Sequence, residues 1–548
     1  MDSEKKHSDE VTVDDILTTL GPFGRFNVFN YILILFPVYL AGMYSSVYNF
    51  EVMDLDYRCS VPECSDEALL NYSIPHDEHG IRSKCLRYAP LTNITEASCS
   101  PDFFDSSTEI ECDQYVYLEE HSIVKTFDLG CKDWKRTLVG TVHNAGFFLS
   151  IPLTGVMSDR WGRKIALIFA CVANGVFGVL RGLSTSYNMF VVFEFLEPAF
   201  GAGVYTACFV LALELVKPKG RVFASLLFNT MFILGGVSVT LLSWWLKNWR
   251  HLLYFIYSPS IVLIVYVFIL TESFRWYFSK GKYEKGFQVL RKAEKINHVV
   301  VPDDDYVMVE KLVMKQREER KKESQDLNQS AFKQLLTSWM IWKRLAICSF
   351  LWIASTLVYY GLSINAIELS GNSYLNYIVI IVIEAPANVC KLIFLDRFGR
   401  KKVISIAYLL AGVILIVYGF VPSGNWSLAF YLGGKFFITL AYNSLYVFAA
   451  EVYPTNYRTT LLAISSTIGR IGSTVAPQTP LLAKLYQYLP TVVFGVIAAV
   501  SSLVVLLLPE TRNMKLPDSL KEAQDQDNPR ENNSKLDCDV EKTIKTRL

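Results

Sequence analysis

The sequence predicts an all-α membrane protein with twelve transmembrane helices in two pseudo-symmetric six-helix bundles. Three observations support this: an apolar composition, twelve long apolar stretches and a short motif that occurs twice at a fixed offset. Of the 548 residues, 51% are hydrophobic and 19% are charged, whereas a soluble chain carries about a quarter charged residues. The composition therefore argues against a soluble multidomain protein. No basic domain points to a nucleic-acid partner.

Twelve apolar stretches are long enough to cross a bilayer as helices, because about 20 helical residues span the ~30 Å hydrocarbon core. They lie at 29–50, 137–157, 165–183, 189–213, 222–245, 252–270, 343–364, 374–394, 403–421, 427–450, 459–483 and 490–508. A polar tail precedes the first stretch, so this stretch is not expected to be a cleaved signal peptide.

These stretches divide the chain into five parts. They are a cytoplasmic N-terminal tail (1–28), an N-terminal six-helix bundle (29–271) with a large loop (51–135), a cytoplasmic linker (272–342), a C-terminal six-helix bundle (343–509) and a cytoplasmic C-terminal tail (510–548). The orientation follows from the short loops 158–164, 214–221 and 396–402, which are rich in Lys and Arg. Such loops mark the cytoplasmic side. We therefore expect a multi-pass plasma-membrane protein with both termini inside the cell and residues 51–135 outside.

The predicted outer loop contains six of the eleven cysteines: Cys59, Cys64, Cys85, Cys99, Cys112 and Cys131. An even number of cysteines in an oxidising compartment predicts three disulfides, and six cysteines allow 15 pairings, which the sequence leaves open. Two N-glycosylation sequons, at Asn71 and Asn93, lie in the same loop. Charge, cysteines and sequons therefore agree on which side of the membrane this loop lies.

The strongest internal signal is a repeat. The hexapeptide 159–164 (DRWGRK) recurs 237 residues later as 396–401 (DRFGRK), and Glu214 and Arg221 recur at the same offset as Glu451 and Arg458. One offset shared by separate loops implies two halves of similar fold. Duplicated halves around a midplane site are typical of secondary transporters.

The repeated charges suggest a conformational gate at the cytoplasmic face. Gly162 allows a tight turn, Asp159 is suited to cap the next helix, and Glu214 with Arg221, like Glu451 with Arg458, is a natural ion pair. The predicted gate residues are Asp159, Arg160, Arg163, Glu214, Arg221, Asp396, Arg397, Arg400, Glu451 and Arg458. Such charges would hold the face closed in one state and separate in the other. The alternative is that they only fix topology and helix packing.

No arrangement of nucleophile, base and metal ligands is present, so we expect neither an enzyme nor a cofactor or metal site. His143 is the only histidine well inside a predicted span. We interpret it as a hydrogen-bonded structural residue.

Several of these stretches resemble signatures of known transporters. Residues 155–164 resemble the loop motif of the major facilitator superfamily, 271–277 (TESFRWY) resemble the "PESPRWL" signature after the sixth helix, and 451–458 (EVYPTNYR) resemble the "ELYPT…R" signature after the tenth. The cysteine-rich loop, with 358–362 and 384–387, is similar to the organic cation, anion and zwitterion (carnitine) transporter family. The resemblance covers 12–512.

This resemblance implies the major facilitator fold and transport of a small organic ion by alternating access, with the lipid bilayer and a coupling or exchanged ion as further partners. The chain departs from the family pattern in the fourth span. There the family usually has an arginine followed four residues later by a glycine, whereas this chain has Glu194 and Pro198, with Glu197 between them.

Arg470 is the principal candidate for substrate binding. It is the only charged residue between Arg458 and Lys484, and charges inside a membrane span are costly enough to be functional candidates. The resemblance places an arginine here in transporters of organic anions and carnitine-like zwitterions, and a guanidinium holds a carboxylate by two parallel hydrogen bonds. The other candidate substrate contacts are Tyr359, Tyr360, Glu384, Asn388, Tyr442, Asn443, Tyr446 and Asn49.

The sequence therefore predicts a transporter of organic anions or zwitterions. One alternative is an organic cation transporter, in which Glu384 and the tyrosines hold the substrate. Another is a membrane sensor or accessory protein that transports nothing. For Arg470 itself, the alternative is a structural role in an ion pair with a buried carboxylate.

Overall fold

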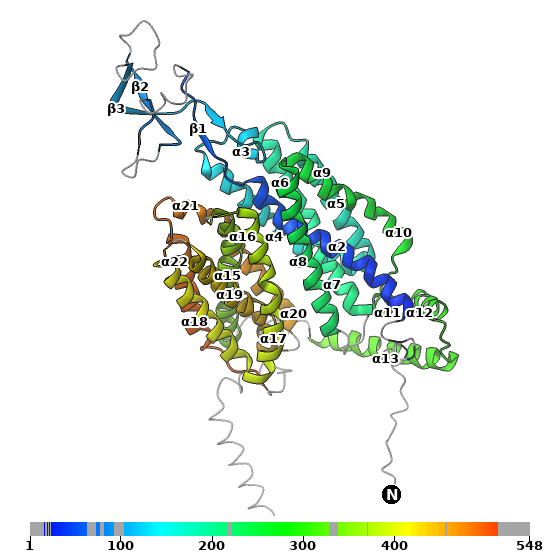
Figure 1. The fold of residues 1–548 in the computed structure, drawn as a ribbon. Coiled ribbons are helices and arrows are strands. Elements are labelled where there is room, and N and C mark those ends of the chain that lie inside the picture. The colour runs from blue at the N-terminus through cyan, green and yellow to red at the C-terminus, as the bar shows by residue number, and fades with distance from the viewer. Residues whose placement is uncertain are drawn as a thin grey trace, which may run out of the picture.

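The fold consists of two helical bundles, a small domain of strands at one end and short helices at the other (Figure 1). It is seen in a computed structural model that describes residues 16, 19, 21, 24–62, 73–76, 82–91, 103–215, 221–327, 338–369, 371–422, 424–454 and 457–512. Within these ranges the chain is predominantly α-helical, as its apolar stretches predict.

The N-terminal bundle contains the first half of the predicted spans. Its helices are α2 (Arg25–Glu51), α4 (Asp133–Trp161), α5 (Arg163–Gly182), α6 (Tyr187–Gly201), α7 (Val204–Leu215), α8 (Arg221–Leu246), α9 (Trp249–Val262), η4 (Leu263–Val265) and α10 (Tyr266–Ile269). Side-chain caps start several of them. Ser186 accepts from the backbone N–H of Met189 at the start of α6, and Asn248 caps α9 in the same way. Such caps satisfy backbone donors that have no partner within the helix.

The C-terminal bundle repeats this arrangement. It contains α15 (Trp339–Asn365), η5 (Ala366–Glu368), α16 (Ser373–Val382), α17 (Glu384–Phe398), α18 (Arg400–Tyr418), α19 (Asn425–Val452), α20 (Arg458–Val475), η6 (Ala476–Gln478), α21 (Pro480–Ala483) and α22 (Leu489–Val505). Helices therefore cover each of the twelve predicted ranges, and some ranges hold two helices in succession.

Eight spans in the described residues are long and apolar enough to cross a membrane. Three of them join successive helices: α6 with α7 in Tyr187–Leu215, α9, η4 and α10 in Trp249–Ile269, and α16 with α17 in Ser373–Phe398. Many of their large apolar side chains are exposed, including Ile32 (63%) and Phe268 (85%). An exposed apolar surface of this kind is expected where a helix faces lipid.

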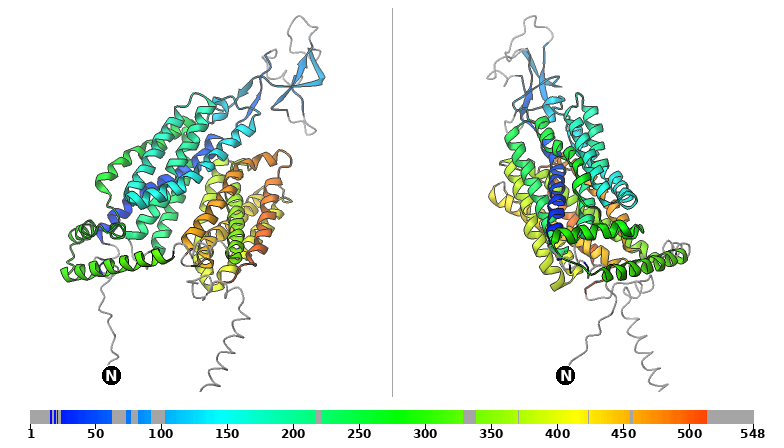
Figure 2. Two further views of the ribbon diagram at one scale, coloured as in Figure 1. Left: turned by 180° about the vertical axis from the view of Figure 1, so that it is seen from behind. Right: turned by 90° about the vertical axis from the view of Figure 1, so that its right-hand side faces the viewer.

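Between the bundles the described residues form the helices α11 (Phe274–Ser279), α12 (Tyr283–Asn297) and α13 (Asp303–Leu327). They lie across the end of the N-terminal bundle, opposite the strands (Figure 2). The Asn297 side-chain oxygen accepts a hydrogen bond from the backbone N–H of Phe26 at 2.8 Å. This bond ties the end of α12 to the start of α2.

The opposite end of the N-terminal bundle has a small domain of two antiparallel strand pairs, which we call the cap. Strand β1 (Tyr57–Cys59) pairs with β4 (Tyr115–Tyr117), and β2 (Leu86–Pro90) pairs with β3 (Phe104–Glu111); α3 (Ile123–Thr126) follows. Its separate core is small and contains two of the cysteines: Cys59, Val61, Ile74, Phe103, Phe104 and Cys112. A core of this size gives little stability by itself.

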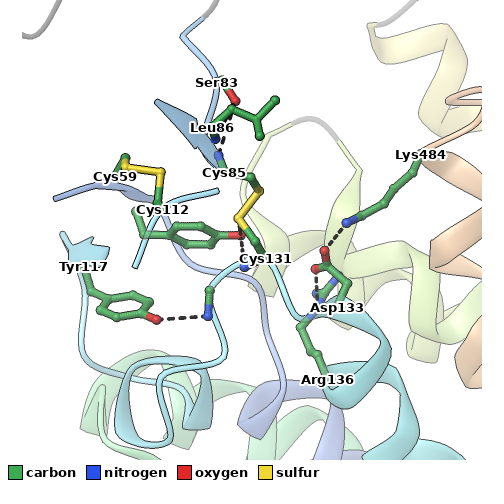
Figure 3. The surroundings of a disulfide bond; sticks show 12 residues. Cys59, Ser83, Cys85, Leu86, Cys112, Tyr117, Cys131, Asp133, Arg136 and Lys484 are labelled. Carbon is green, nitrogen blue, oxygen red and sulfur yellow. Dashed lines mark hydrogen bonds and ion pairs between the residues drawn. A yellow bond between two sulfur atoms is a disulfide. The ribbon is translucent and has the colours of Figure 1, made fainter. Parts of the chain in front are cut away.

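Two disulfides strengthen the cap, Cys59–Cys112 and Cys85–Cys131 (Figure 3). Of the three predicted disulfides, these two are therefore present. The remaining predicted cysteines, Cys64 and Cys99, and the sequon residues Asn71 and Asn93 lie outside the described residues.

The cap is attached firmly to the bundle. The Ser122 hydroxyl donates a hydrogen bond to the Glu51 carbonyl at 2.8 Å, at the end of α2. The Tyr117 hydroxyl accepts from the Gly130 N–H at 3.0 Å and donates to Asp128 at 2.8 Å. Cys131, two residues before α4, is held by its disulfide. The cap therefore connects to both α2 and α4.

Removing one disulfide is expected to loosen the cap without unfolding the bundles. Replacing both Cys85 and Cys131 by serine should destabilise the cap by ~2–4 kcal/mol, because the cross-link restricts the unfolded chain. The expected result is faster trypsin cleavage within 51–132 on intact cells. Cys390→Ala, which removes a free cysteine on α17, is the control. Equal resistance of all three proteins to trypsin would contradict the prediction.

Candidate functional site

Arg470 lies on α20, where this helix faces the other bundle. Its side chain is half-buried, and its guanidinium carbon stands 5.0 Å from the ring centre of Phe147 on α4. The glycines beside it bring α20 close to α15. A Cβ at Gly469 would lie 2.6 Å from the Cβ of Trp352, and one at Gly472 would lie 2.2 Å from a backbone oxygen of α15. The small residues therefore serve close helix packing here.

Arg470 has no carboxylate partner within ion-pair distance among the described residues. The phenol groups of Tyr360, Tyr442 and Tyr446 interact with its guanidinium, Tyr360 through a hydrogen bond. The structure therefore does not show the ion pair that a purely structural arginine would need among the described carboxylates. A guanidinium between phenol hydroxyls and an aromatic face keeps donors available for an anion.

Aromatic rings form a continuous wall beside Arg470. The centres of the Tyr359 and Tyr442 rings lie 5.1 Å apart, and those of Tyr442 and Tyr446 lie 5.6 Å apart. Tyr360 meets Tyr359 edge-on at 5.1 Å. The sequence interpretation missed Trp352, whose ring lies 4.3 Å from that of Tyr446. Its position seven residues before Tyr359 places it on the same face of α15 two turns away.

Glu384, the acid predicted for this site, is bound by other groups. Its Oε1 lies 3.0 Å from the Nζ of Lys435 and accepts a hydrogen bond from the Tyr359 hydroxyl at 2.6 Å. Lys435 is fully buried, donates to the Ser363 hydroxyl at 2.7 Å and lies 3.4 Å above the Tyr359 ring centre. The two opposite charges compensate each other, which leaves Arg470 as the uncompensated charge of this wall.

The three predicted asparagines fall into two places. The Asn443 amide donates to the Asn388 oxygen at 2.8 Å, which joins α19 to α17. Asn49 instead donates to the Tyr377 hydroxyl at 3.0 Å. It lines a small cavity between the bundles at the cap end, with Tyr48, Thr137, Gly140, Ile364 and Pro477 among the other lining residues.

The N-terminal bundle contains a network of charges that the sequence interpretation missed. We call Glu51, His143, Arg181, Glu194 and Glu197 the acidic cluster. The Arg181 guanidinium contacts Glu194 at 2.5 Å, Glu51 at 2.9 Å and Glu197 at 3.5 Å. His143 Nδ1 lies 2.8 Å from Glu194, so His143 is hydrogen-bonded as predicted, and 3.6 Å from Glu197.

The repeated motifs form the same ion pairs in both bundles. Arg163 contacts Asp159 at 2.7 Å and Glu214 at 3.1 Å. At the equivalent places Arg400 contacts Asp396 and Glu451, both at 3.1 Å.

Glu451 pairs with Arg400, and the predicted pairs of Glu214 with Arg221 and of Glu451 with Arg458 stay predictions. Glu214 pairs with Arg163, and the Arg221 side chain lies outside the described part of the chain. The pairs that the structure shows have a geometric reason. The arginine after the turn glycine begins the next helix and lies next to the end of the helix that carries the glutamate.

The helix cap predicted for Asp159 is wrong, because Glu272 takes that place at the start of α5. The Glu272 carboxylate accepts from the backbone N–H of Arg163 at 3.0 Å and of Lys164 at 3.1 Å. Burial raises the pKa of Glu272, and these backbone donors oppose the rise by stabilising its charged form. Gly162 is required here: its φ is 115°, and a Cβ would lie 2.1 Å from the Glu272 carboxylate.

The C-terminal bundle has an equivalent carboxylate, Glu510, which accepts from the backbone N–H of Arg400 at 3.0 Å and of Lys401 at 3.4 Å. Gly399 has φ 95°, and a Cβ there would lie 2.9 Å from Glu510. The offset from Glu272 is one residue longer than that of the other repeats. Glu272 and Glu510 are therefore not matched when the two halves are compared at the offset of 237 residues.

The hydrogen bonds and ion pairs that join the bundles, within the described ranges, lie at the cap end. Gln478 accepts from Thr137 at 3.0 Å and donates to Thr141 at 2.7 Å, and Lys484 pairs with Asp133. The ion pairs of the repeated motifs stay within their own bundles. The ribbons of the two bundles also diverge away from the cap (Figure 2). This arrangement is closed at the cap end.

The carboxylates Glu272 and Glu510, which cap the helices after the repeated motifs, offer a test of a conformational role. Charge-assisted hydrogen bonds contribute ~1.5–3 kcal/mol each, so Glu272→Gln and Glu510→Gln should change the balance between conformations. We expect about three- to tenfold slower turnover at normal surface level. Asp159→Asn and Asp396→Asn should have smaller effects, because both aspartates are mostly exposed and exposed pairs contribute little.

The control for these variants is Glu284→Gln, which changes an exposed acid on α12. Unchanged turnover in both Glu272→Gln and Glu510→Gln would leave these carboxylates with a packing role only.

Comparison with known proteins agrees with this architecture. The family model described as "Sugar (and other) transporter" matches residues 102–519. An organic cation transporter protein of Drosophila melanogaster is 31% identical, covering 93% of this chain and 94% of the relative. Organic cation/carnitine transporter 2 of Homo sapiens is 30% identical, covering 93% of each chain. The xylose transporter XylE from E. coli, solved in an inward-open conformation, has a similar fold, with a TM-score of 0.57, 16% identity and coverage of 90% of this chain and 98% of XylE.

Proposed function

This chain belongs to the sugar (and other) transporter family of the major facilitator superfamily, within its organic cation, anion and carnitine transporter group, and from that premise we propose that it carries organic anions or carnitine-like zwitterions across the plasma membrane by alternating access. Members of this family are transporters and not enzymes. The type of substrate and the residues that bind it are the proposal.

Arg470 is the observation that carries the proposal. It is a half-buried guanidinium at the contact between the bundles, with aromatic neighbours and no described carboxylate partner. Because an unpaired charge inside a membrane is costly, a partner from outside the protein would stabilise it. A substrate carboxylate fits, since a guanidinium offers two parallel donors.

The aromatic wall suits the remainder of such a substrate. Tyr359, Tyr360, Tyr442 and Tyr446, with Trp352, present faces that accept apolar groups and also the ammonium end of a zwitterion. The Asn388–Asn443 pair would add neutral hydrogen-bonding groups. An anion-binding centre beside an aromatic wall can accommodate a zwitterion with its two ends in different surroundings.

A second candidate is an organic cation, which the names of the relatives favour, since they include organic cation transporters. Glu384 would then bind the substrate. Against this, Lys435 and Tyr359 already occupy one oxygen of the Glu384 carboxylate. A cation would have to compete with a buried lysine for that carboxylate, whereas an anion finds Arg470 without a competing acid.

The proposed topology places twelve helices in the membrane, the cap outside and α11–α13 inside the cell. The separation of the cap from the basic motif loops at opposite ends of the bundles supports this (Figure 1). Binding of an antibody to an epitope inserted after Leu91 should occur on intact cells. An epitope in α13 should be reached only after permeabilisation.

Uptake of radiolabelled compounds by cells that express the full chain tests the proposal. The panel consists of a monocarboxylate anion, a carnitine-like zwitterion and a quaternary ammonium cation, each with and without sodium. Uptake of the anion or zwitterion above vector-only cells supports it. Uptake of the cation alone would favour the second candidate. Uptake of none of them, with the protein at the surface, would contradict both.

A further inference from the structure

The acidic cluster holds three carboxylates and one guanidinium in the interior of the N-terminal bundle. The side chains of Glu51, Arg181 and Glu194 are 0% exposed, Glu197 is 2% exposed and His143 is 4% exposed. Such groups have no access to water, and their charges must be compensated within the cluster.

Arg181 alone does not compensate them. One guanidinium against three carboxylates leaves two uncompensated negative charges when His143 is neutral. Two such charges inside a membrane bundle are costly, so the cluster is expected to hold one or two protons. A proton on His143 would face two of these carboxylates, since its Nδ1 is hydrogen-bonded to Glu194 at 2.8 Å and lies 3.6 Å from Glu197. One oxygen of Glu51 is buried and has no hydrogen-bond partner.

The groups around these carboxylates come from five helices. Tyr44, Tyr48 and Glu51 belong to α2, His143 to α4, Cys171 and Arg181 to α5, Glu194 and Glu197 to α6, and Tyr257 to α9. The Tyr257 hydroxyl accepts a hydrogen bond from Arg181 at 3.0 Å. Of these neighbours, Arg181 is the fixed positive charge. A proton is therefore the remaining way to compensate the acids.

The cluster is connected to the proposed substrate site through α4. His143 and Phe147 are four residues apart, and their rings meet edge-on at 5.8 Å. Phe147 in turn lies below the guanidinium of Arg470 at 5.0 Å. Tyr48 stacks on His143 at 5.1 Å and lines the cavity between the bundles.

The same helix also forms the contacts that close the cap end. Asp133, Thr137 and Thr141 of α4 bind residues of the C-terminal bundle. The protonation state of the cluster, the occupancy of the substrate site and the closure of the cap end therefore all act on one helix. This is the arrangement that coupling between two ligands requires.

We propose that the acidic cluster is a proton-binding site that couples proton movement to substrate transport. This rests on the function proposed above. A proton from outside binds at the Glu197–His143 pair, forming one O–H or N–H bond. After the bundles rearrange, that bond breaks and the proton leaves to the cytoplasm with the substrate. With a monocarboxylate the cycle moves no net charge, and with a zwitterion it moves one positive charge inward.

Proteoliposomes that contain the full chain test this proposal, with whichever labelled compound of the panel is carried. An outside-acid gradient of about one pH unit should drive up to about tenfold accumulation of a monocarboxylate. Glu197→Gln and His143→Gln should abolish this accumulation. They should keep exchange of labelled for unlabelled substrate, because exchange needs no net proton movement. His251→Gln, which changes an exposed histidine of α9, should accumulate substrate as the wild type does.

A second measurement does not depend on the variants. Adding unlabelled substrate outside vesicles of wild-type protein should acidify the lumen, as read by a trapped pH-sensitive dye. Wild-type transport without any effect of the gradient and without acidification would overturn the proton site and leave the proposed function intact. Accumulation that survives in both variants would overturn it as well. If no compound of the panel is carried, the proposed function fails and the proton site fails with it.

Discussion

Arg470→Asp is expected to reduce uptake of a carboxylate substrate by about 100-fold or more, because loss of one partner of a buried charge pair costs ~2–5 kcal/mol. The variant also reverses the sign of the site. Arg470→Lys keeps the charge but loses the planar pair of donors, so a loss of about tenfold is expected. The measurement is initial uptake divided by the amount of protein at the surface.

The control is Arg291→Asp, which changes an exposed arginine of α12 that pairs with Asp303. It should transport as the wild type does. If Arg470→Asp reaches the surface and carries the carboxylate at the wild-type rate, the proposed role of Arg470 is wrong. Cation transport based on Glu384, Tyr359 and Tyr360 would then become the better hypothesis.

Lys435→Met is expected to remove most of the protein from the cell surface. It leaves the Glu384 carboxylate buried beside Tyr359 without its cation, and breaking a buried pair costs ~3–5 kcal/mol. The double variant Lys435→Met with Glu384→Gln removes both charges and should recover much of the surface protein. Surface biotinylation and the melting temperature in detergent measure both effects.

Lys391→Met is the matched control. Lys391 lies on α17, like Glu384, and makes no ion pair with any described residue. It should leave surface level and melting temperature unchanged. Normal amounts of Lys435→Met at the surface, or a double variant no better than the single one, would show that the pair contributes little to stability.

The positions of the helices could be predicted from the sequence because a membrane span requires a long apolar stretch, whatever it packs against. Breaks within spans could not. The range 189–213 reads as one helix, yet α6 ends at Gly201 and α7 begins at Val204. Whether a glycine interrupts a helix depends on what approaches it, and a Cβ at Gly203 would lie 1.9 Å from Thr154 of α4. That contact is not visible in the sequence.

The candidate site, like the helices, could be predicted only in part from the sequence. Arg470 stands out because it is a lone charge in an apolar stretch. The acidic cluster does not, since Glu51 and Arg181 lie near the ends of their spans, where charges are common. Only the fold of the N-terminal bundle, which brings Glu51 of α2 to Arg181 of α5, makes them one group. The ion pair between Lys435 and Glu384 likewise joins two residues that are 51 positions apart in the sequence. No local sequence pattern links them.

The attachment of the cap has a mechanical consequence. The cap is bonded to the end of α2 and, through Cys131, to the start of α4, whereas the C-terminal bundle meets this end of the molecule through Lys484 and Gln478. Under the proposed alternating access, in which the bundles rock against each other, the cap would travel with the N-terminal half as a rigid lever. Since it projects beyond that half (Figure 1), a small rotation becomes a large displacement at its tip. A fluorophore on the cap, paired with one on α21, would report each turn of the transport cycle.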